Sequence, residues 1–258
     1  MPPPSPPADL ADRYLDLVER ALMNEIVGES RLETAWRFAR LRLAHPWRTR
    51  KWRSPWPARA LTMLSRAQLT HLRGCVAAVV GDGIAGDFIE TGVWRGGACI
   101  LMRATLAAYG VRDRRVFVAD SFEGLPPPDP HRYPADRKDT LHTYRELAIS
   151  EAQVRRNFEA FGLLDEQVVF LKGLFRDTLP GLGDARFALI RLDGDMYEST
   201  MDALVNLYDR LSVGGFVLID DYGALAGCRR AVHDFLDAQA LTPRLEPTDR
   251  GAVWWRKL

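Results

Sequence analysis

Residues 87–97 read Asp87-Phe88-Ile89-Glu90-Thr91-Gly92-Val93-Trp94-Arg95-Gly96-Gly97, a short apolar strand that enters a turn rich in glycine. Glycine at positions 92 and 96 lets the backbone approach a ligand closely just before a helix begins. The turn differs from the GxGxxG pattern that binds a pyrophosphate, and Glu90 precedes it. An acidic residue there favours a ligand with a cationic group. A plain turn between a strand and a helix would leave the same pattern, so this second interpretation stays open.

The order of strand and then helix repeats along the chain. We expect further strands at residues 115–120, 168–171, 187–192 and 216–219, with helices at 96–109, 150–161, 198–211 and 228–240. A last strand at 252–256 closes a hairpin after the final helix. This alternation predicts a right-handed, mostly parallel α/β sheet covered on both faces, with an antiparallel C-terminal strand. In such sheets ligands bind beyond the carboxyl ends of the strands.

The composition is that of a globular enzyme with no dominant charge. The chain has 258 residues, of which 47% are hydrophobic, and a net charge of +1, which gives no reason to expect a nucleic acid or an anionic membrane as partner. Cys75, Cys99 and Cys228 form no CxxC pair, and no apolar run reaches the length of a membrane span. We therefore expect a cytoplasmic protein.

The N-terminal third of the chain has a different character. We expect the proline-rich residues 1–7 to be disordered, and residues 8–27 and 58–80 to be helical. Residues 31–59 are basic and rich in tryptophan, and their prolines break them into short pieces. Such a stretch can bind nucleic acid or pack against the core, but the balanced overall charge favours a lid or a dimer surface.

The predicted organisation is a helical cap followed by one large domain. Residues 8–80 form the cap, which serves as a lid and possible dimer surface, and residues 81–258 form the domain that contains the sheet. Residues 126–143 are a second candidate lid, because a loop of this length is unusual in a compact domain.

A carboxylate ends the second predicted strand. Asp120 stands at a position where nucleotide-binding α/β folds place an acid that accepts hydrogen bonds from both ribose hydroxyls. NAD and S-adenosylmethionine both contain this ribose, so Asp120 indicates a nucleoside cofactor without selecting one. An exposed loop acid or a helix cap is the alternative.

Three further carboxylates follow the next two predicted strands. Asp193 ends one of them, and Asp220 and Asp221 end the other. Because the carboxyl ends of parallel strands meet at one edge of a sheet, we expect the three side chains to converge. Mg²⁺ prefers oxygen ligands, and a bound cation would relieve the repulsion among them. Capping or salt bridging would also explain these acids, and Asp195 is expected to cap the following helix.

Four segments together resemble the macrocin O-methyltransferase family, whose members methylate deoxysugar hydroxyls of macrolide and aminocoumarin antibiotics. They are residues 89–97, 118–126, 192–200 and 214–222, and the similarity extends over about residues 58–237. The resemblance implies a Rossmann-like class I methyltransferase fold, S-adenosylmethionine and Mg²⁺ as cofactors, and a glycosylated natural product as acceptor.

The resemblance also implies roles for individual residues. It makes Asp193, Asp220 and Asp221 the metal ligands, and Asp193 the general base that removes the acceptor proton. The residues that it assigns to the cofactor site are Met63, Glu90, Thr91, Gly92, Arg95, Gly96, Asp120, Ser121, Phe122, Gly173 and Asp193. Leu174 departs from the tryptophan expected after Lys172-Gly173, which bears on the identity of the acceptor rather than on the reaction.

Two other functions are compatible with a nucleoside crevice. A nicotinamide-dependent sugar or sugar-nucleotide oxidoreductase should have a GxGxxG turn after its first strand, or a Tyr-x-x-x-Lys pair near its site. The turn at residues 92–97 does not have the first pattern, and no such pair lies near the predicted site. A non-catalytic partner protein that binds a nucleoside or sugar would have little reason to keep three clustered carboxylates. We therefore expect a methyltransferase that acts on a glycoside, does not bind nucleic acid and forms a homodimer.

Overall fold

Seven strands form one mixed sheet in the computed structural model, which describes residues 8–28, 30–44 and 57–258. In chain order the strands are β1 (Asp87–Thr91), β2 (Val116–Asp120), β3 (Val168–Lys172), β4 (Phe187–Leu192), β5 (Leu211–Ile219), β6 (Glu246–Pro247) and β7 (Val253–Arg256). Across the sheet their order is β3-β2-β1-β4-β5-β7-β6. Strands β1 to β5 pair in parallel, whereas β7 is antiparallel to β5 and β6. The predicted sheet is confirmed.

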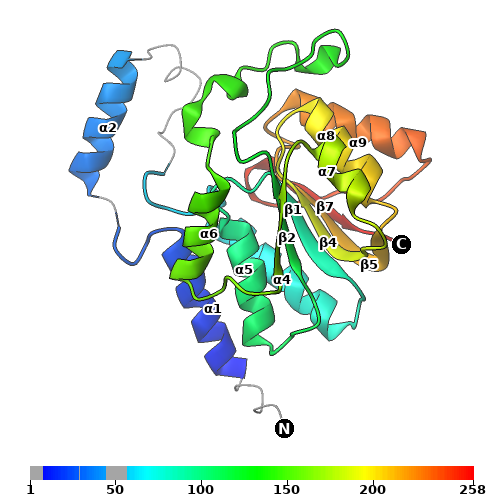
Figure 1. Ribbon diagram of the computed structural model, residues 1–258, viewed down its shortest axis with the longest axis horizontal. Helices are drawn as coiled ribbons and strands as arrows, with labels where there is room; N and C mark the ends of the chain where they lie inside the picture. The colour runs from blue at the N-terminus through cyan, green and yellow to red at the C-terminus, as the bar shows by residue number, and fades with distance from the viewer. Residues whose placement is uncertain (1–7, 29, 45–56) are drawn as a thin grey trace.

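Helices cover both faces of this sheet (Figure 1). The α-helices in the described ranges are α1 (Ala8–Leu22), α2 (Arg31–Ala44), α4 (Arg66–Gly81), α5 (Gly97–Ala108), α6 (Glu151–Ala160), α7 (Phe175–Thr178), α8 (Tyr197–Leu207) and α9 (Ala226–Ala238). Helices α1, α4, α5 and α6 bury side chains against one face, and α8 and α9 against the other. None of these helices combines the length and the apolar composition needed to cross a membrane.

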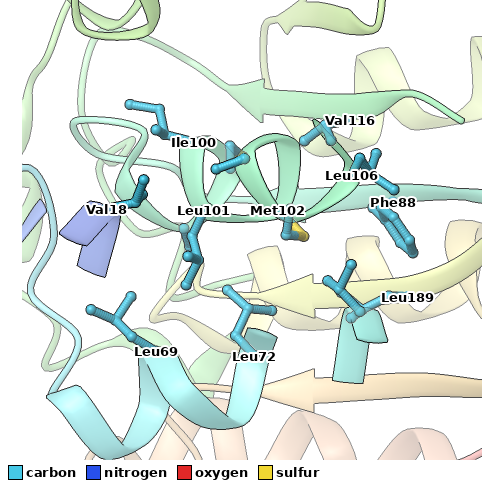
Figure 2. Packing of buried hydrophobic residues seen from close by; sticks show 14 of the residues in the cluster. Val18, Leu69, Leu72, Phe88, Ile100, Leu101, Met102, Leu106, Val116 and Leu189 are labelled. Carbon is cyan, nitrogen blue, oxygen red and sulfur yellow. The ribbon is translucent and has the colours of Figure 1, made fainter. Parts of the chain in front are cut away.

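The core on the first face is built around α5. Figure 2 shows Leu106 of α5 close to Phe88 of β1, and Leu101 of the same helix pointing toward Leu69 and Leu72 of α4. Helix α1 adds to this cluster the side chains of Ala11, Leu15, Val18 and Leu22. The two N-terminal helices α1 and α4 therefore share one core with the sheet, and the division of the chain near residue 80 stays a prediction.

Helices α4 and α2 each begin after a capping serine, and α4 begins later than predicted. Helix α4 begins after Ser65, because residues 57–65 are held in a non-helical path by Arg95, whose Nη1 donates to three of their carbonyl oxygens. Residues 31–44, the first part of the basic stretch, form one helix, and the Ser30 hydroxyl caps it by accepting from the Glu33 N–H at 3.0 Å. The predictions for residues 1–7 and 45–56 lie outside the described residues.

Candidate active site

A pocket opens at the carboxyl ends of β1 to β4, where parallel sheets bind their ligands. Its wall includes residues from each of these strand ends, from the loop after β2 and from the segment that precedes α4. Six of the predicted cofactor-site residues line it, namely Met63, Gly92, Asp120, Ser121, Gly173 and Asp193. Leu174 also lines the pocket, at the position where the family resemblance led us to expect tryptophan.

Gly92 is required by the close approach of two strand ends. Its φ of +86° lies in the left-handed region, and a Cβ on this residue would stand 1.9 Å from the backbone oxygen of Asp193. The Asp193 N–H donates to the Thr91 carbonyl at 2.9 Å, so the ends of β1 and β4 are joined at this point. The glycine that the sequence assigned to ligand binding therefore also sets the position of Asp193.

Asp120 connects the turn after β1 with the loop after β2. Its Oδ2 accepts from the Val93 N–H and its Oδ1 from the Phe122 N–H, both at 2.8 Å. Burial raises the pKa of this carboxyl above its usual value, and the hydrogen bonds oppose that effect. The carboxylate faces the pocket from the end of β2, which is the position that suits a ribose.

Five of the predicted cofactor-site residues do not belong to the described residues that line this pocket: Glu90, Thr91, Arg95, Gly96 and Phe122. Thr91 and Phe122 are buried, and Gly96 adopts a left-handed conformation as the N-cap of α5. Arg95 binds the backbone of residues 57–60 and stacks over the Trp94 ring, 4.2 Å from its centroid. These residues are close in the chain to pocket-lining residues but do not line the pocket themselves, and their direct contact with a cofactor stays a prediction.

A buried arginine connects three of the acids. Arg191 is the β4 residue paired with Glu90 of β1, and both side chains are 2% exposed. Arg191 Nη1 donates to Glu90 and, at 2.7 Å, to Asp193 Oδ2, while Nη2 donates to Asp220 Oδ1 at 2.6 Å. The second oxygen of Glu90 accepts from the Cys99 thiol at 2.9 Å. Glu90, which we expected beside a cationic ligand group, thus already has a cationic partner within the protein.

The three carboxylates predicted to converge do so. One oxygen from each of Asp193, Asp220 and Asp221 lies within 4.8 Å of the others. Protein donors reach one oxygen of each carboxylate: Arg191 binds Asp193 and Asp220, and the Asp195 N–H binds Asp221 Oδ2 at 3.0 Å. The remaining oxygens are the candidate ligand atoms for a cation.

The charge of this cluster is only partly balanced. Burial, reinforced by the neighbouring carboxylate of Asp193, raises the pKa of Asp220 to about 6. Burial and the carboxylates of Asp195, Asp193 and Asp220 raise the pKa of Asp221 well above its usual value. Arg191 binds three carboxylates, and those of Asp221 and Asp195 add further negative charge. An oxygen-only donor set with excess negative charge fits a hard divalent cation such as Mg²⁺.

The start of α8, which follows the turn after Asp193, is held by a residue far away in the sequence. The carboxylate of Asp136, in the long loop after β2, accepts from the Tyr197 N–H at 2.7 Å and from the Glu198 N–H at 3.0 Å. Met196 occupies the N-cap position of α8. The expectation that Asp195 caps this helix is therefore wrong. Asp195, with φ +65°, instead lines the pocket and donates its N–H to Asp221.

Sequence reasoning missed three residues that organise the site. Arg191 was visible as a charged residue inside an otherwise apolar strand, and Gln68 as the partner of Ser65 in a capping box. Gln68 donates its side-chain amide to Asp220 Oδ1 at 3.2 Å. Asp136 gave no local signal, since its role depends on where the long loop lies.

Comparison with known proteins agrees with this geometry. The family described as Macrocin-O-methyltransferase (TylF) matches residues 11–257. The chain is 48% identical over 249 residues to the 8-demethyl-8-(2,3-dimethoxy-alpha-L-rhamnosyl)-tetracenomycin-C 4'-O-methyltransferase of Streptomyces olivaceus, covering 96% of this chain and 94% of that protein. It is 50% identical over 203 residues to the demethyldecarbamoylnovobiocin O-methyltransferase of Streptomyces niveus, covering 78% of each.

Solved structures give the same result. The O-methyltransferase NovP superposes with a TM-score of 0.84 at 44% identity, covering 96% of this chain and 99% of that chain. The calicheamicin methyltransferase CalS11, at 24% identity and a TM-score of 0.62, covers 89% of this chain and 94% of its own and supports the fold alone. The match along nearly the whole chain, to relatives that are named O-methyltransferases, shows that the protein belongs to the macrocin O-methyltransferase family.

Proposed function

We propose that this protein transfers a methyl group from S-adenosylmethionine to a sugar hydroxyl of a glycosylated natural product, with Mg²⁺ held by Asp193, Asp220 and Asp221. The observation that carries the proposal is the carboxylate cluster that meets the pocket at Asp193, and that the buried guanidinium of Arg191 leaves negatively charged. Relatives named for a rhamnosyl tetracenomycin, a novobiocin precursor and mycinamicin III support a glycoside as the acceptor.

The pocket residues suit the parts of S-adenosylmethionine. Asp120, at the end of β2, would accept hydrogen bonds from the ribose hydroxyls. Gly92 and Gly173, both with positive φ, allow the backbone to approach the ligand closely. Met63 supplies an apolar contact from the segment before α4. Negative charge at the neighbouring cluster favours the cationic sulfonium.

Asp193 is the residue best placed to act on the acceptor. It lines the pocket and also belongs to the carboxylate cluster. Arg191 holds its Oδ2, which fixes the direction in which the other oxygen points. Mg²⁺, when bound, would lower the pKa of an acceptor hydroxyl at this point. Asp193 would then take the proton, and the pocket would align the acceptor oxygen with the methyl carbon and sulfur.

The replacement Asp193→Asn tests this assignment. It should lower kcat by about 100-fold or more with Mg²⁺ present, because general base catalysis contributes roughly that much. Asp237→Asn, which removes an exposed carboxylate at the end of α9, is the control and should leave kcat unchanged. Binding of S-adenosylhomocysteine, measured by calorimetry, reports whether the pocket stays intact. A variant with near-wild-type turnover would overturn the role of Asp193.

The dimer and the lid formed by residues 8–80 remain part of the proposal. Several large apolar side chains on or next to α1 and α2 are exposed, as a subunit contact or a lid would require: Leu10, Leu17, Ile26, Val27, Leu32, Trp36 and Leu43. In Figure 1, α2 stands apart from the sheet. Sedimentation equilibrium measures the oligomeric state directly, and a monomer at micromolar concentration would contradict the predicted dimer.

A further inference from the structure

The side chain of Gln68 makes two separate hydrogen bonds, one at the start of its own helix and one to Asp220. It is the third residue of α4, and its side chain is part of the capping box that starts this helix at Ser65. Its Oε1 accepts from the Ser65 N–H at 2.9 Å, and its Nε2 donates to Asp220 Oδ1 at 3.2 Å. The residue is 6% exposed, so water has little access to either contact.

The two contacts determine how the amide is oriented. A backbone N–H can only donate, so the atom that faces Ser65 must be the oxygen of the amide. The nitrogen therefore faces Asp220, and a carboxylate oxygen accepts its hydrogen. Rotating the amide by 180° would place two donors face to face at Ser65 and two acceptors face to face at Asp220, which excludes the alternative orientation.

Asp220 is held from two sides through the same oxygen. Arg191 Nη2 reaches Oδ1 at 2.6 Å from the sheet, and Gln68 Nε2 reaches it from α4. With Oδ1 occupied by two donors, Oδ2 is the atom left for a cation. Arg191 also binds Glu90 and Asp193, whereas the Gln68 amide nitrogen donates to Asp220 and to no other acid of the cluster.

We propose that Gln68 is a positioning residue for the metal site, fixing Asp220 so that Oδ2 points toward the cation; this rests on the proposed function. The short segment that contains Gln68 also reaches the cofactor pocket. Met63 lines that pocket, and the Leu61 carbonyl accepts from the Gly97 N–H at the start of α5. The segment from Leu61 to Gln68 thus contacts the start of α5 at one end and Asp220, a proposed metal ligand, at the other.

The test compares two variants that weaken the same helix cap. Gln68→Met keeps the side-chain volume and helix propensity but removes both hydrogen bonds, whereas Ser65→Ala weakens the cap and keeps the Gln68 amide. Mn²⁺ is the probe, and its affinity for the cofactor-free protein is measured by electron paramagnetic resonance. Loss of a hydrogen bond to a metal ligand weakens binding by 10-fold to 100-fold in metalloproteins, so we expect about 10-fold for Gln68→Met. Ser65→Ala should bind Mn²⁺ as the wild type does.

Three further measurements complete the test. Thermal melting should show similar, small losses for both variants, and affinity for S-adenosylhomocysteine should not change. In methyl transfer, Gln68→Met should raise the Mg²⁺ concentration needed for half-maximal rate while kcat at saturating Mg²⁺ stays close to wild type. Wild-type Mn²⁺ affinity in Gln68→Met, or equal weakening in Ser65→Ala, overturns the role of Gln68. Wild-type protein that binds no Mn²⁺ refutes the proposed metal site itself.

Discussion

Arg191→Met should destabilise the metal-free protein severely. The guanidinium and the Glu90 carboxylate that it binds are each 2% exposed, so the substitution leaves a buried carboxylate without a cation. Breaking such a pair from one side costs about 3–5 kcal/mol, a large part of the roughly 5–15 kcal/mol that stabilises a domain. The contacts to Asp193 and Asp220 are less buried, at 27% and 24% exposure, and add less.

Urea unfolding at neutral pH in the presence of a chelator measures this loss. The matched control is Arg115→Met, because Arg115 also pairs with a strand carboxylate, that of Asp87, but its side chain is 51% exposed. That change should cost less than about 1 kcal/mol. The double variant Arg191→Met/Glu90→Gln should recover much of the loss, since it removes the stranded charge. A single variant within about 1 kcal/mol of wild type, or a double variant no more stable than the single one, would refute the reasoning.

Three further predictions concern the neighbouring elements. Gly92→Ala should lower the Tm and weaken S-adenosylhomocysteine binding, because φ at this residue is +86° and the new Cβ would meet the backbone oxygen of Asp193. Thermal melting and calorimetry measure the two effects, and a variant that shows neither contradicts the prediction. Asp136→Ala should cost about 1–2 kcal/mol in urea unfolding through loss of the α8 cap, and an unchanged midpoint argues against that cap. The pKa of Asp220 is higher in the folded protein, at about 6, than its ordinary 3.8, so metal-free protein should lose stability as the pH rises through this interval. Mg²⁺ should reverse that loss above pH 6, and parallel pH profiles with and without Mg²⁺ would contradict the argument.

The sheet could be predicted because its strands leave strong local signals. β1 and β4 are short apolar runs that end in a glycine turn or a carboxylate, and each is followed by a segment of helical composition. The start of α4 could not be predicted as easily. Residues 57–65 look helical in isolation, but Arg95 binds their carbonyl oxygens from the turn after β1. That contact joins segments about 35 residues apart and has no local signature.

The convergence of Asp193, Asp220 and Asp221 followed from topology alone, because adjacent parallel strands end at one edge. The hydrogen-bond donors to these acids could not be predicted from the topology. Glu90 and Arg191 meet because the register of β1 and β4 sets them side by side, and register depends on the packing of the whole sheet. Gln68 reaches Asp220 from a helix 152 positions away in the chain. Sequence patterns therefore identified the acids but not the groups that orient them.

The excess negative charge of this carboxylate cluster favours binding of a divalent cation. When ionised, the carboxylates of Glu90, Asp193, Asp220, Asp221 and the neighbouring Asp195 outnumber the guanidinium groups of Arg191 and Arg250, so the cluster is negatively charged. Without a metal, burial, reinforced by the neighbouring carboxylates, raises the pKa values of Asp220 and Asp221 and favours their protonation, and a protonated carboxyl is a poor metal ligand. Mg²⁺ at the proposed site would offset part of this negative charge. The negative charge that remains would still attract the positively charged sulfonium. After methyl transfer the sulfur becomes neutral and this attraction ends, which favours release of the product cofactor.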